Sequence, residues 1–232
     1  MTIKGILWDL DGVLMDTGEF HYQAWAHTLA AFQIPFSREL FRETFGMNNR
    51  GILERLLGHP PGQALYMQIS DQKEEMFRRV IHGQVKPLPG VLETLHYLDS
   101  KGLRQAIASS APPGNIDALV DELGLRDCFN AIVSGSALAG KPAPDVFLLS
   151  ARAIGVSPQD CLVIEDAVTG VEGAKRAGMR CLAVTNTNPA EKLSQADFVV
   201  ASLDQVPAIF WDELSGLANA KNASGPKRNN QP

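Results

Sequence analysis

Two aspartates at the end of a short apolar segment have the spacing that first suggests chemistry in this chain. The apolar residues 5–8 lead directly into Asp9 and Asp11, and Gly12 follows. An apolar run of this length next to a turn residue predicts a buried strand. Because open α/β sheets keep their reactive crevice at the carboxyl ends of the strands, we expect both carboxylates to lie there.

Other polar residues follow further apolar segments in the same way. Ser109 and the pair Glu165-Asp166 each end such a segment, and Lys141 lies a little downstream of a third. If these segments are parallel strands of one sheet, their carboxyl ends share one rim. The sequence therefore brings acids, a hydroxyl and an amine together on that rim.

This combination of groups suits phosphoryl transfer. Clustered carboxylates repel one another, and a hard cation such as Mg²⁺ with oxygen ligands relieves that repulsion. One aspartate can attack phosphorus and form an aspartyl phosphate, and a second carboxylate can serve as general acid and base. Ser109 and Lys141 would hold the phosphate oxygens by hydrogen bond and charge.

The motifs resemble those of the haloacid dehalogenase superfamily, in its β-phosphoglucomutase-like and sugar-phosphatase branch. The resemblance runs from residue 3 to residue 200. It implies that Asp9 is the nucleophile and Asp11 the acid/base. It also implies that Mg²⁺ is held by Asp9, the backbone carbonyl of Asp11, and Asp166, with Glu165 close by. Ser109 and Lys141 then form the second and third motifs.

The resemblance also extends to residues that would contact the substrate. In members of this family, the first cap helix contains a histidine that hydrogen-bonds near the acid/base and a tryptophan that lines the pocket. The expected substrate-binding residues are Thr17, His21, Trp25, Arg50, Lys73 and Ser110. Asp16 and Thr17 are expected to cap the following helix rather than to react, with Thr17 also placed to face the site.

The segment after Ser109 departs from the mutase pattern. β-Phosphoglucomutases have a polar run with Lys and Asn there, which grips a second phosphate. Residues 110–114 have the sequence Ser-Ala-Pro-Pro-Gly and offer neither. The sequence therefore favours a phosphatase that hydrolyses a small phosphorylated metabolite of the sugar-phosphate class. The alternative is β-phosphoglucomutase-like transfer between glucose 1-phosphate and glucose 6-phosphate.

The order of helical and strand patterns predicts the fold. Residues 18–85 show helical periodicity and no strand alternation, which indicates an inserted all-α cap domain. After residue 86, strands and helices alternate, which predicts a parallel sheet with helices on both faces. The resemblance implies a Rossmann-like, doubly wound α/β core. The expected division is a core of residues 1–16 and 86–217, a helical cap of residues 17–85, and a disordered tail of residues 218–232.

The individual elements can be placed from periodicity and turn residues. Strands are predicted at residues 3–10, 104–109, 131–134, 161–165, 180–184 and 198–200. Helices are predicted at residues 19–32, 52–57, 64–81, 115–123, 144–154, 168–177 and 207–217. Ser37 is expected to cap a further helix that contains Leu40.

Composition limits the possible partners. The formal net charge of −5 argues against a nucleic-acid surface, and no apolar run is long enough to span a bilayer. The three cysteines are odd in number and form no C-x-x-C pattern, and Cys161 and Cys181 each open a strand-like run, which predicts buried reduced thiols. We therefore expect a cytoplasmic monomer whose partner is a small phosphorylated substrate.

Two functions of other classes share part of this pattern. A phosphoaccepting receiver module also combines aspartates, a hydroxyl and a lysine on an α/β sheet. The helical insert, Gly12 and the second acid at Asp11 argue against that module. A protein that only binds ligands is the other alternative, and the complete set of motif residues argues against it.

Overall fold

The computed structural model describes residues 2–216, and this part of the chain contains one six-stranded parallel sheet. The strands are β1 (Gly5–Trp8), β2 (Arg104–Ser109), β3 (Ala131–Ser134), β4 (Cys161–Glu165), β5 (Arg180–Val184) and β6 (Phe198–Val200). Their order across the sheet is β3-β2-β1-β4-β5-β6. The chain thus winds outward from β1 in both directions, which confirms the predicted doubly wound α/β class.

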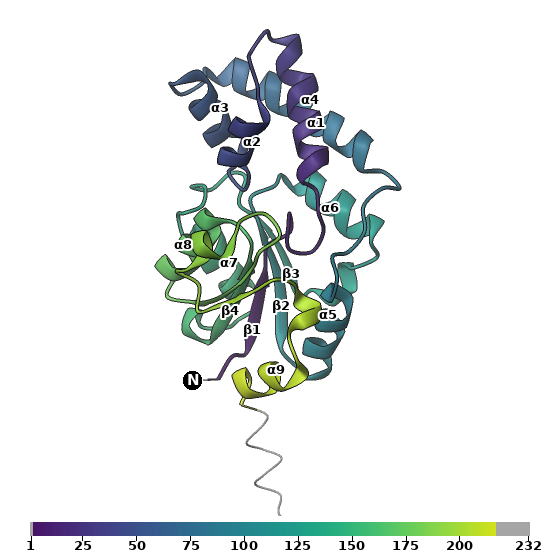
Figure 1. The fold of residues 1–232 in the computed structure, drawn as a ribbon, viewed down its shortest axis with the longest axis vertical. Helices are drawn as coiled ribbons and strands as arrows, with labels where there is room; N and C mark the ends of the chain where they lie inside the picture. The colour runs from purple at the N-terminus through teal and green to yellow at the C-terminus, as the bar shows by residue number, and fades with distance from the viewer. Residues whose placement is uncertain (1, 217–232) are drawn as a thin grey trace, which may run out of the picture.

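Four helices that follow β1 in the chain form a separate group, and the other α-helices lie against the sheet (Figure 1). That group consists of α1 (Gly18–Ala31), α2 (Arg38–Thr44), α3 (Asn49–Leu57) and α4 (Gln63–Ile81). The remaining α-helices are α5 (Val91–Ser100), α6 (Pro113–Glu122), α7 (Asp145–Ala153), α8 (Val168–Arg176) and α9 (Ala208–Leu214). Short 3-10 helices are η1 (Arg126–Cys128), η2 (Pro158–Asp160), η3 (Ala190–Leu193) and η4 (Leu203–Gln205).

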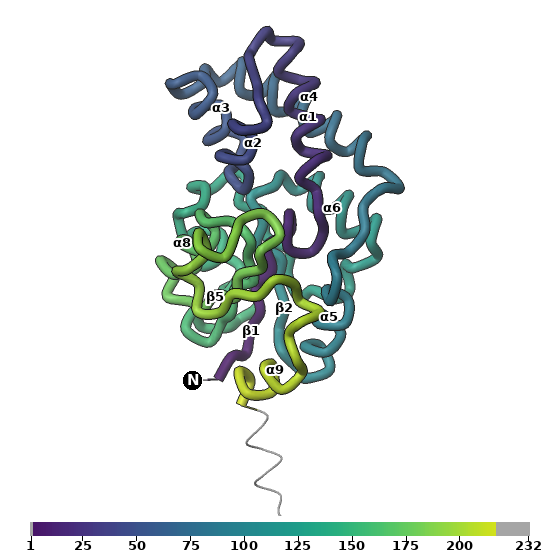
Figure 2. Tube along the Cα trace, in the orientation of Figure 1, coloured from purple at the N-terminus to yellow at the C-terminus, as the bar shows by residue number. Residues whose placement is uncertain are grey.

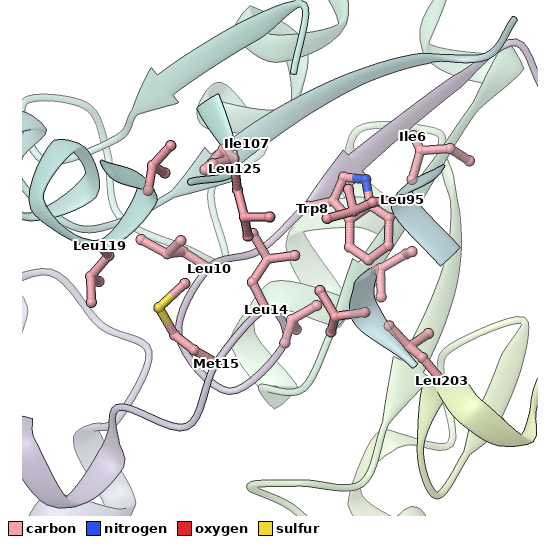
Figure 3. Close-up of a cluster of buried hydrophobic side chains, with 14 of the residues drawn as sticks. Ile6, Trp8, Leu10, Leu14, Met15, Leu95, Ile107, Leu119, Leu125 and Leu203 are labelled. Carbon is pink, nitrogen blue, oxygen red and sulfur yellow. The ribbon is translucent and has the colours of Figure 1, made fainter. Parts of the chain in front are cut away.

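Both faces of the sheet are covered, because successive side chains of a strand point to opposite faces. Trp8 packs in a cluster with residues of α5, α6 and α9, whereas Leu7 packs in a second cluster with residues of α7 and α8. Figure 3 shows Trp8 beside Leu95 of α5, with Ile107 of β2 in the same cluster. The central strand β1 is therefore buried on both sides, which fixes the position of the residues that follow it.

Helices α1 to α4, called the cap helices from here on, gather at one end of the molecule (Figure 1). The tube in Figure 2 shows the two chain segments that connect them to the core. These connections run side by side, since the backbone N–H of Leu88 donates to the carbonyl of Leu14 at 2.9 Å. The cap helices have an apolar cluster of their own, made of Trp25, Leu29, Ile52, Leu53 and Ile69. All four helices fall within the predicted residues 17–85, whose boundaries as a separate domain stay a prediction.

The predicted strand bounds are confirmed for β2 to β6. The first strand is shorter than predicted, because its ladder ends where the chain turns towards Gly12, which has a φ of +84°. Helix α5 was not predicted, although its buried residues Val91, Leu95 and Leu98 have helical spacing. The expected cap of α2 is confirmed, since Ser37 accepts a hydrogen bond from the N–H of Leu40 at 3.2 Å.

The expected disordered tail of residues 218–232 lies outside the described residues. Among the helices of residues 2–216, none has the length and apolar character that a membrane span requires.

Candidate active site

Three carboxylates meet at the carboxyl ends of the two central strands. Asp9 directly follows β1, Glu165 ends β4, and Asp166 comes next. Because β1 and β4 are neighbours, one carboxylate oxygen of each residue lies within 4.8 Å of the others. All three residues are buried. Buried carboxylates at this spacing repel one another, and a divalent cation with oxygen ligands relieves that repulsion. The donor set therefore fits Mg²⁺.

Lys141 is the cation that the protein itself supplies to this cluster. Its Nζ atom lies 2.5 Å from Oδ1 of Asp9 and 2.5 Å from Oε1 of Glu165. Burial alone would lower the pKa of Lys141, but the two carboxylates raise it above its ordinary value. The side chain is thus a buried ammonium. The sequence placed it near the rim less directly than the acids, and the structure brings it into contact with two of them.

One lysine does not balance the charge of three carboxylates, and the pKa values of two of these acids are raised. Burial raises the pKa of Asp9 to about 8, and Glu165 and Asp11 add to this effect against the attraction of Lys141. Burial, followed by the charges of Glu165 and Asp9, raises the pKa of Asp166 well above its ordinary value. A divalent cation bound here would therefore compete with protons for these carboxylates.

Two glycines make room for the carboxylates. A Cβ atom on Gly12, whose φ is +84°, would lie 2.0 Å from Oδ2 of Asp166. A Cβ atom on Gly170 would lie 1.8 Å from Oε1 of Glu165. Since such distances are far below van der Waals contact, neither position can accept a side chain without displacing an acid.

The loop after β5 also serves this cluster, and the sequence analysis did not identify it. Thr187 donates a hydrogen bond through Oγ1 to Oδ2 of Asp166, and Nδ2 of Asn188 donates to the Asp166 carbonyl at 3.1 Å. Nδ2 of Asn186 donates to the carbonyl of Gly12 at 2.9 Å. In the sequence, residues 185–188 are a polar run directly after a buried strand, a pattern that is also typical of ordinary turns.

The side chain of Asp11 contacts the start of the cap, through Thr17 and His21. Its Oδ1 atom accepts a hydrogen bond from Oγ1 of Thr17 and lies 3.1 Å from Nε2 of His21. Burial would raise the pKa of Asp11, but His21 and Thr17 outweigh burial and lower it. The helix-capping role considered for Thr17 is wrong, since its side chain makes no cap hydrogen bond to α1. Asp16 instead accepts from the N–H of Gly18 at 3.1 Å.

His21 is held from its other side by Lys73 of α4. Nδ1 of His21 lies 2.9 Å from Nζ of Lys73, and the imidazole stacks on the ring of Phe77 at a centroid distance of 4.0 Å. Burial and the charge of Lys73 lower the pKa of His21, against the attraction of Asp11. Because an ammonium can only donate, Nδ1 accepts and the ring proton sits on Nε2, facing Asp11.

A pocket opens between the sheet and the cap above Asp9 and Asp11. Of the predicted substrate-binding residues, four line it: His21, Trp25, Lys73 and Ser110. The rest of its wall is largely apolar and comes mainly from the cap, including Phe41, Phe45, Met47 and Ile52. The pocket is thus acidic on the side of the sheet and largely apolar on the side of the cap.

The other predicted residues are placed differently. Arg50 lines an adjoining groove, where its guanidinium lies 4.3 Å from the centre of the Tyr66 ring and donates to Gln63 at 3.1 Å. Ser109 is buried, and its Oγ accepts a hydrogen bond from the N–H of Ala111 at 3.0 Å. Thr17 is also buried and contacts the site through Asp11.

Residues 3–178 match the family model of haloacid dehalogenase-like hydrolases. The chain belongs to this family. The β-phosphoglucomutase of Bacillus subtilis (strain 168) is 34% identical over 207 residues, which cover 85% of this chain and 89% of that protein. The phosphorylated carbohydrates phosphatase of Thermotoga maritima is 30% identical over 200 residues, covering 85% and 93% of the two chains.

The fold has the same relatives. The crystal structure of a β-phosphoglucomutase from Clostridium difficile superimposes on this chain with a TM-score of 0.83 at 26% sequence identity. The match covers 94% of this chain and 100% of that protein. The resemblance drawn from the motifs is therefore confirmed, down to the β-phosphoglucomutase-like branch. The relatives in this branch include both phosphatases and mutases.

Proposed function

We propose that the chain is a Mg²⁺-dependent phosphatase that hydrolyses a small sugar phosphate through an aspartyl phosphate. One observation carries this proposal: one carboxylate oxygen each of the buried residues Asp9, Glu165 and Asp166 lies within 4.8 Å of the others, and Asp9 also lines the pocket. Lys141, 2.5 Å from Asp9, adds the positive charge that a phosphate needs.

In the first step, a carboxylate oxygen of Asp9 attacks phosphorus and forms an acyl phosphate. The bond between phosphorus and the ester oxygen breaks, and the leaving oxygen takes a proton from Asp11, which must enter this step in its acid form although Thr17 and His21 favour the carboxylate. In the second step, Asp11 accepts a proton from water, which attacks phosphorus and releases inorganic phosphate and free Asp9. Lys141 and Ser109 bind phosphate oxygens, in the roles that the motifs predict.

A bound Mg²⁺ would be held by Asp9, Asp166 and the carbonyl of Asp11, with Glu165 nearby, and would neutralise charge on the transferring phosphoryl group. The cap has a part as well. Since Thr17 and His21 belong to the cap side and both contact Asp11, seating of the cap orients the acid/base and excludes bulk water.

β-Phosphoglucomutase-like transfer is the second candidate, and the 34% identity to a mutase favours it. Against it stands the segment 110–114, Ser-Ala-Pro-Pro-Gly, which has no Lys or Asn to hold a second phosphate. A mutase must bind a bisphosphate in two orientations, whereas hydrolysis needs only one phosphate site. The segment therefore supports the phosphatase.

A screen of phosphorylated metabolites with Mg²⁺ tests the proposal by measuring released phosphate. We expect hexose phosphates to be hydrolysed and Asp9→Asn to abolish turnover. Asp16→Asn is the matched control, because Asp16 is exposed in the same loop and asparagine can keep its hydrogen bond to Gly18. Conversion of β-glucose 1-phosphate to glucose 6-phosphate, with a bisphosphate activator and little phosphate release, would instead support the mutase.

A further inference from the structure

Lys73 is the only lysine or arginine, within the described residues, that lines the pocket above Asp9. Its ammonium has three hydrogens to donate. Three acceptors surround it: Nδ1 of His21 at 2.9 Å, and Oε1 and Oε2 of Glu74, both at 3.0 Å. The ammonium therefore has no hydrogen left for a ligand, and its charge is balanced by the carboxylate of Glu74.

Glu74 is fixed in this position by contacts from both the cap and the core. Nδ2 of Asn49 donates to its Oε1 at 2.6 Å, and Nδ2 of Asn115 in α6 donates to its Oε2 at 2.5 Å. Asn115 is in turn held by Arg78, whose guanidinium donates to its Oδ1 at 3.0 Å. Glu74 is only 6% exposed and Asn115 is fully buried. Glu74 cannot leave Lys73 without losing these bonds.

Within residues 2–216, the remaining pocket wall contains no second lysine or arginine. The aromatic residues Trp25, Phe41 and Phe45 form much of it, and beyond the acids and His21 its other polar groups are uncharged: Asn48, Asn49 and Ser110. An anion placed against these side chains would lose its water without gaining a charged partner, which is unfavourable. An uncharged sugar face can instead pack on the aromatic rings.

We propose that Glu74 is a specificity-determining residue that restricts the pocket to phosphate monoesters whose leaving group carries no second negative charge. This inference rests on the proposed function, since it assumes that the reacting phosphate lies at Asp9. It names the substrate class within the sugar phosphates: monophosphates with a neutral polyol or sugar part, and not bisphosphates.

The test compares a hexose 6-phosphate with the corresponding hexose 1,6-bisphosphate, which carries the same ester and one added phosphate. kcat/KM is measured from phosphate release, and Kd is measured by calorimetry on Asp9→Asn, a substitution that keeps the size of the side chain. For wild type, we expect the monophosphate to be favoured by about 10- to 100-fold, the value of one missing charge-assisted hydrogen bond.

Glu74→Gln tests the residue directly. Because a glutamine amide has one acceptor oxygen, the substitution frees a hydrogen of Lys73 and leaves its charge unbalanced. The preference for the monophosphate should fall by about tenfold. Glu75→Gln is the matched control: Glu75 is the next residue of α4, its side chain is 59% exposed, and it pairs with Arg79. This control should keep the wild-type preference.

The proposal is overturned if wild type handles both esters equally in kcat/KM and Kd, or if folded Glu74→Gln keeps the full preference. If Glu74→Gln does not fold, the wild-type ratio decides alone. If neither ester is hydrolysed but the Kd ratio holds on Asp9→Asn, the phosphatase proposal fails and the assignment of Glu74 stands.

Discussion

The ammonium nitrogen of Lys141 lies 2.5 Å from Oδ1 of Asp9, the carboxylate that we propose attacks phosphorus. The two residues are 132 positions apart in the chain, and both are buried. The contact therefore joins the loop before α7 to the end of β1. In the proposed reaction, the nucleophile and the phosphate would therefore share one fixed positive charge.

Lys141→Met removes that charge and keeps most of the side-chain volume. We expect turnover to fall by at least about 100-fold, because a preorganised group that stabilises transition-state charge is lost. The measurement is kcat/KM for phosphate release with Mg²⁺ present. Lys175→Met is the control, since Lys175 pairs with Asp197 at the surface, outside the site. Retention of wild-type turnover by Lys141→Met would refute the proposed role.

Thr17→Val tests the positioning of the acid/base. Valine has nearly the shape of threonine but cannot donate the hydrogen bond to Oδ1 of Asp11. We expect turnover to fall by at least about tenfold, because a hydrogen bond to a charged group contributes about 1.5–3 kcal/mol. Since that bond lowers the pKa of Asp11, the limb of the pH–rate profile due to Asp11 should move to higher pH. A role in packing alone would leave this limb in place.

The sequence predicted the acids of this site well, for a physical reason. Asp9, Glu165 and Asp166 end two buried strands, and neighbouring parallel strands bring their carboxyl ends together whatever the loops do. Side chains on loops and cap helices have no such constraint. Arg50 therefore lies on the adjoining groove rather than in the pocket, and Thr17 bonds Asp11 rather than capping α1.

The loop of Asn186, Thr187 and Asn188 shows a second limit of the sequence. Its residues bond Asp166 and Gly12, but a run of short polar residues is typical of any turn. Only the pairing of β5 beside β4 shows that this turn adjoins the acids. The network around Glu74 was also missed, because it depends on how α4 packs against α6.

Binding of Mg²⁺ is expected to depend on pH, because the metal competes with protons on Asp9 and Asp166. Burial raises the pKa of Asp9 to about 8, so at neutral pH the metal-free carboxyl is largely protonated. Mg²⁺ affinity should therefore rise with pH up to about 8, and binding should release protons. Calorimetry in buffers of different ionisation enthalpy measures both effects. An affinity that is constant from pH 6 to pH 8 would contradict the assignment.

The same carboxyl makes the stability of the metal-free protein depend on pH. The native pKa of about 8 exceeds the ordinary value of 3.8, so between these values the native state binds more protons than the unfolded state. The contribution of Asp9 to the free energy of unfolding is therefore present below pH 4 and lost as the pH rises towards 8. Asp9→Asn should remove this contribution, so its Tm should fall less than that of wild type between pH 6 and pH 8. An equal pH dependence of Tm in the two proteins would contradict the raised pKa of Asp9.

Gly12→Ala and Gly58→Ala form a matched pair that separates backbone strain from crowding of the acids. Both glycines have positive φ, +84° and +74°, so each alanine costs about 1 kcal/mol of backbone strain. At Gly58, no atom lies within 4 Å of the added Cβ, whereas at Gly12 the Cβ would lie 2.0 Å from Oδ2 of Asp166. Gly58→Ala should therefore lower Tm by only about 2–4 °C and leave Mg²⁺ affinity unchanged. Gly12→Ala should displace Asp166 and weaken Mg²⁺ binding by at least about tenfold, the lower range for a disturbed ligand shell. Equal Mg²⁺ affinities in the two variants, measured by calorimetry, would show that Asp166 does not hold the metal.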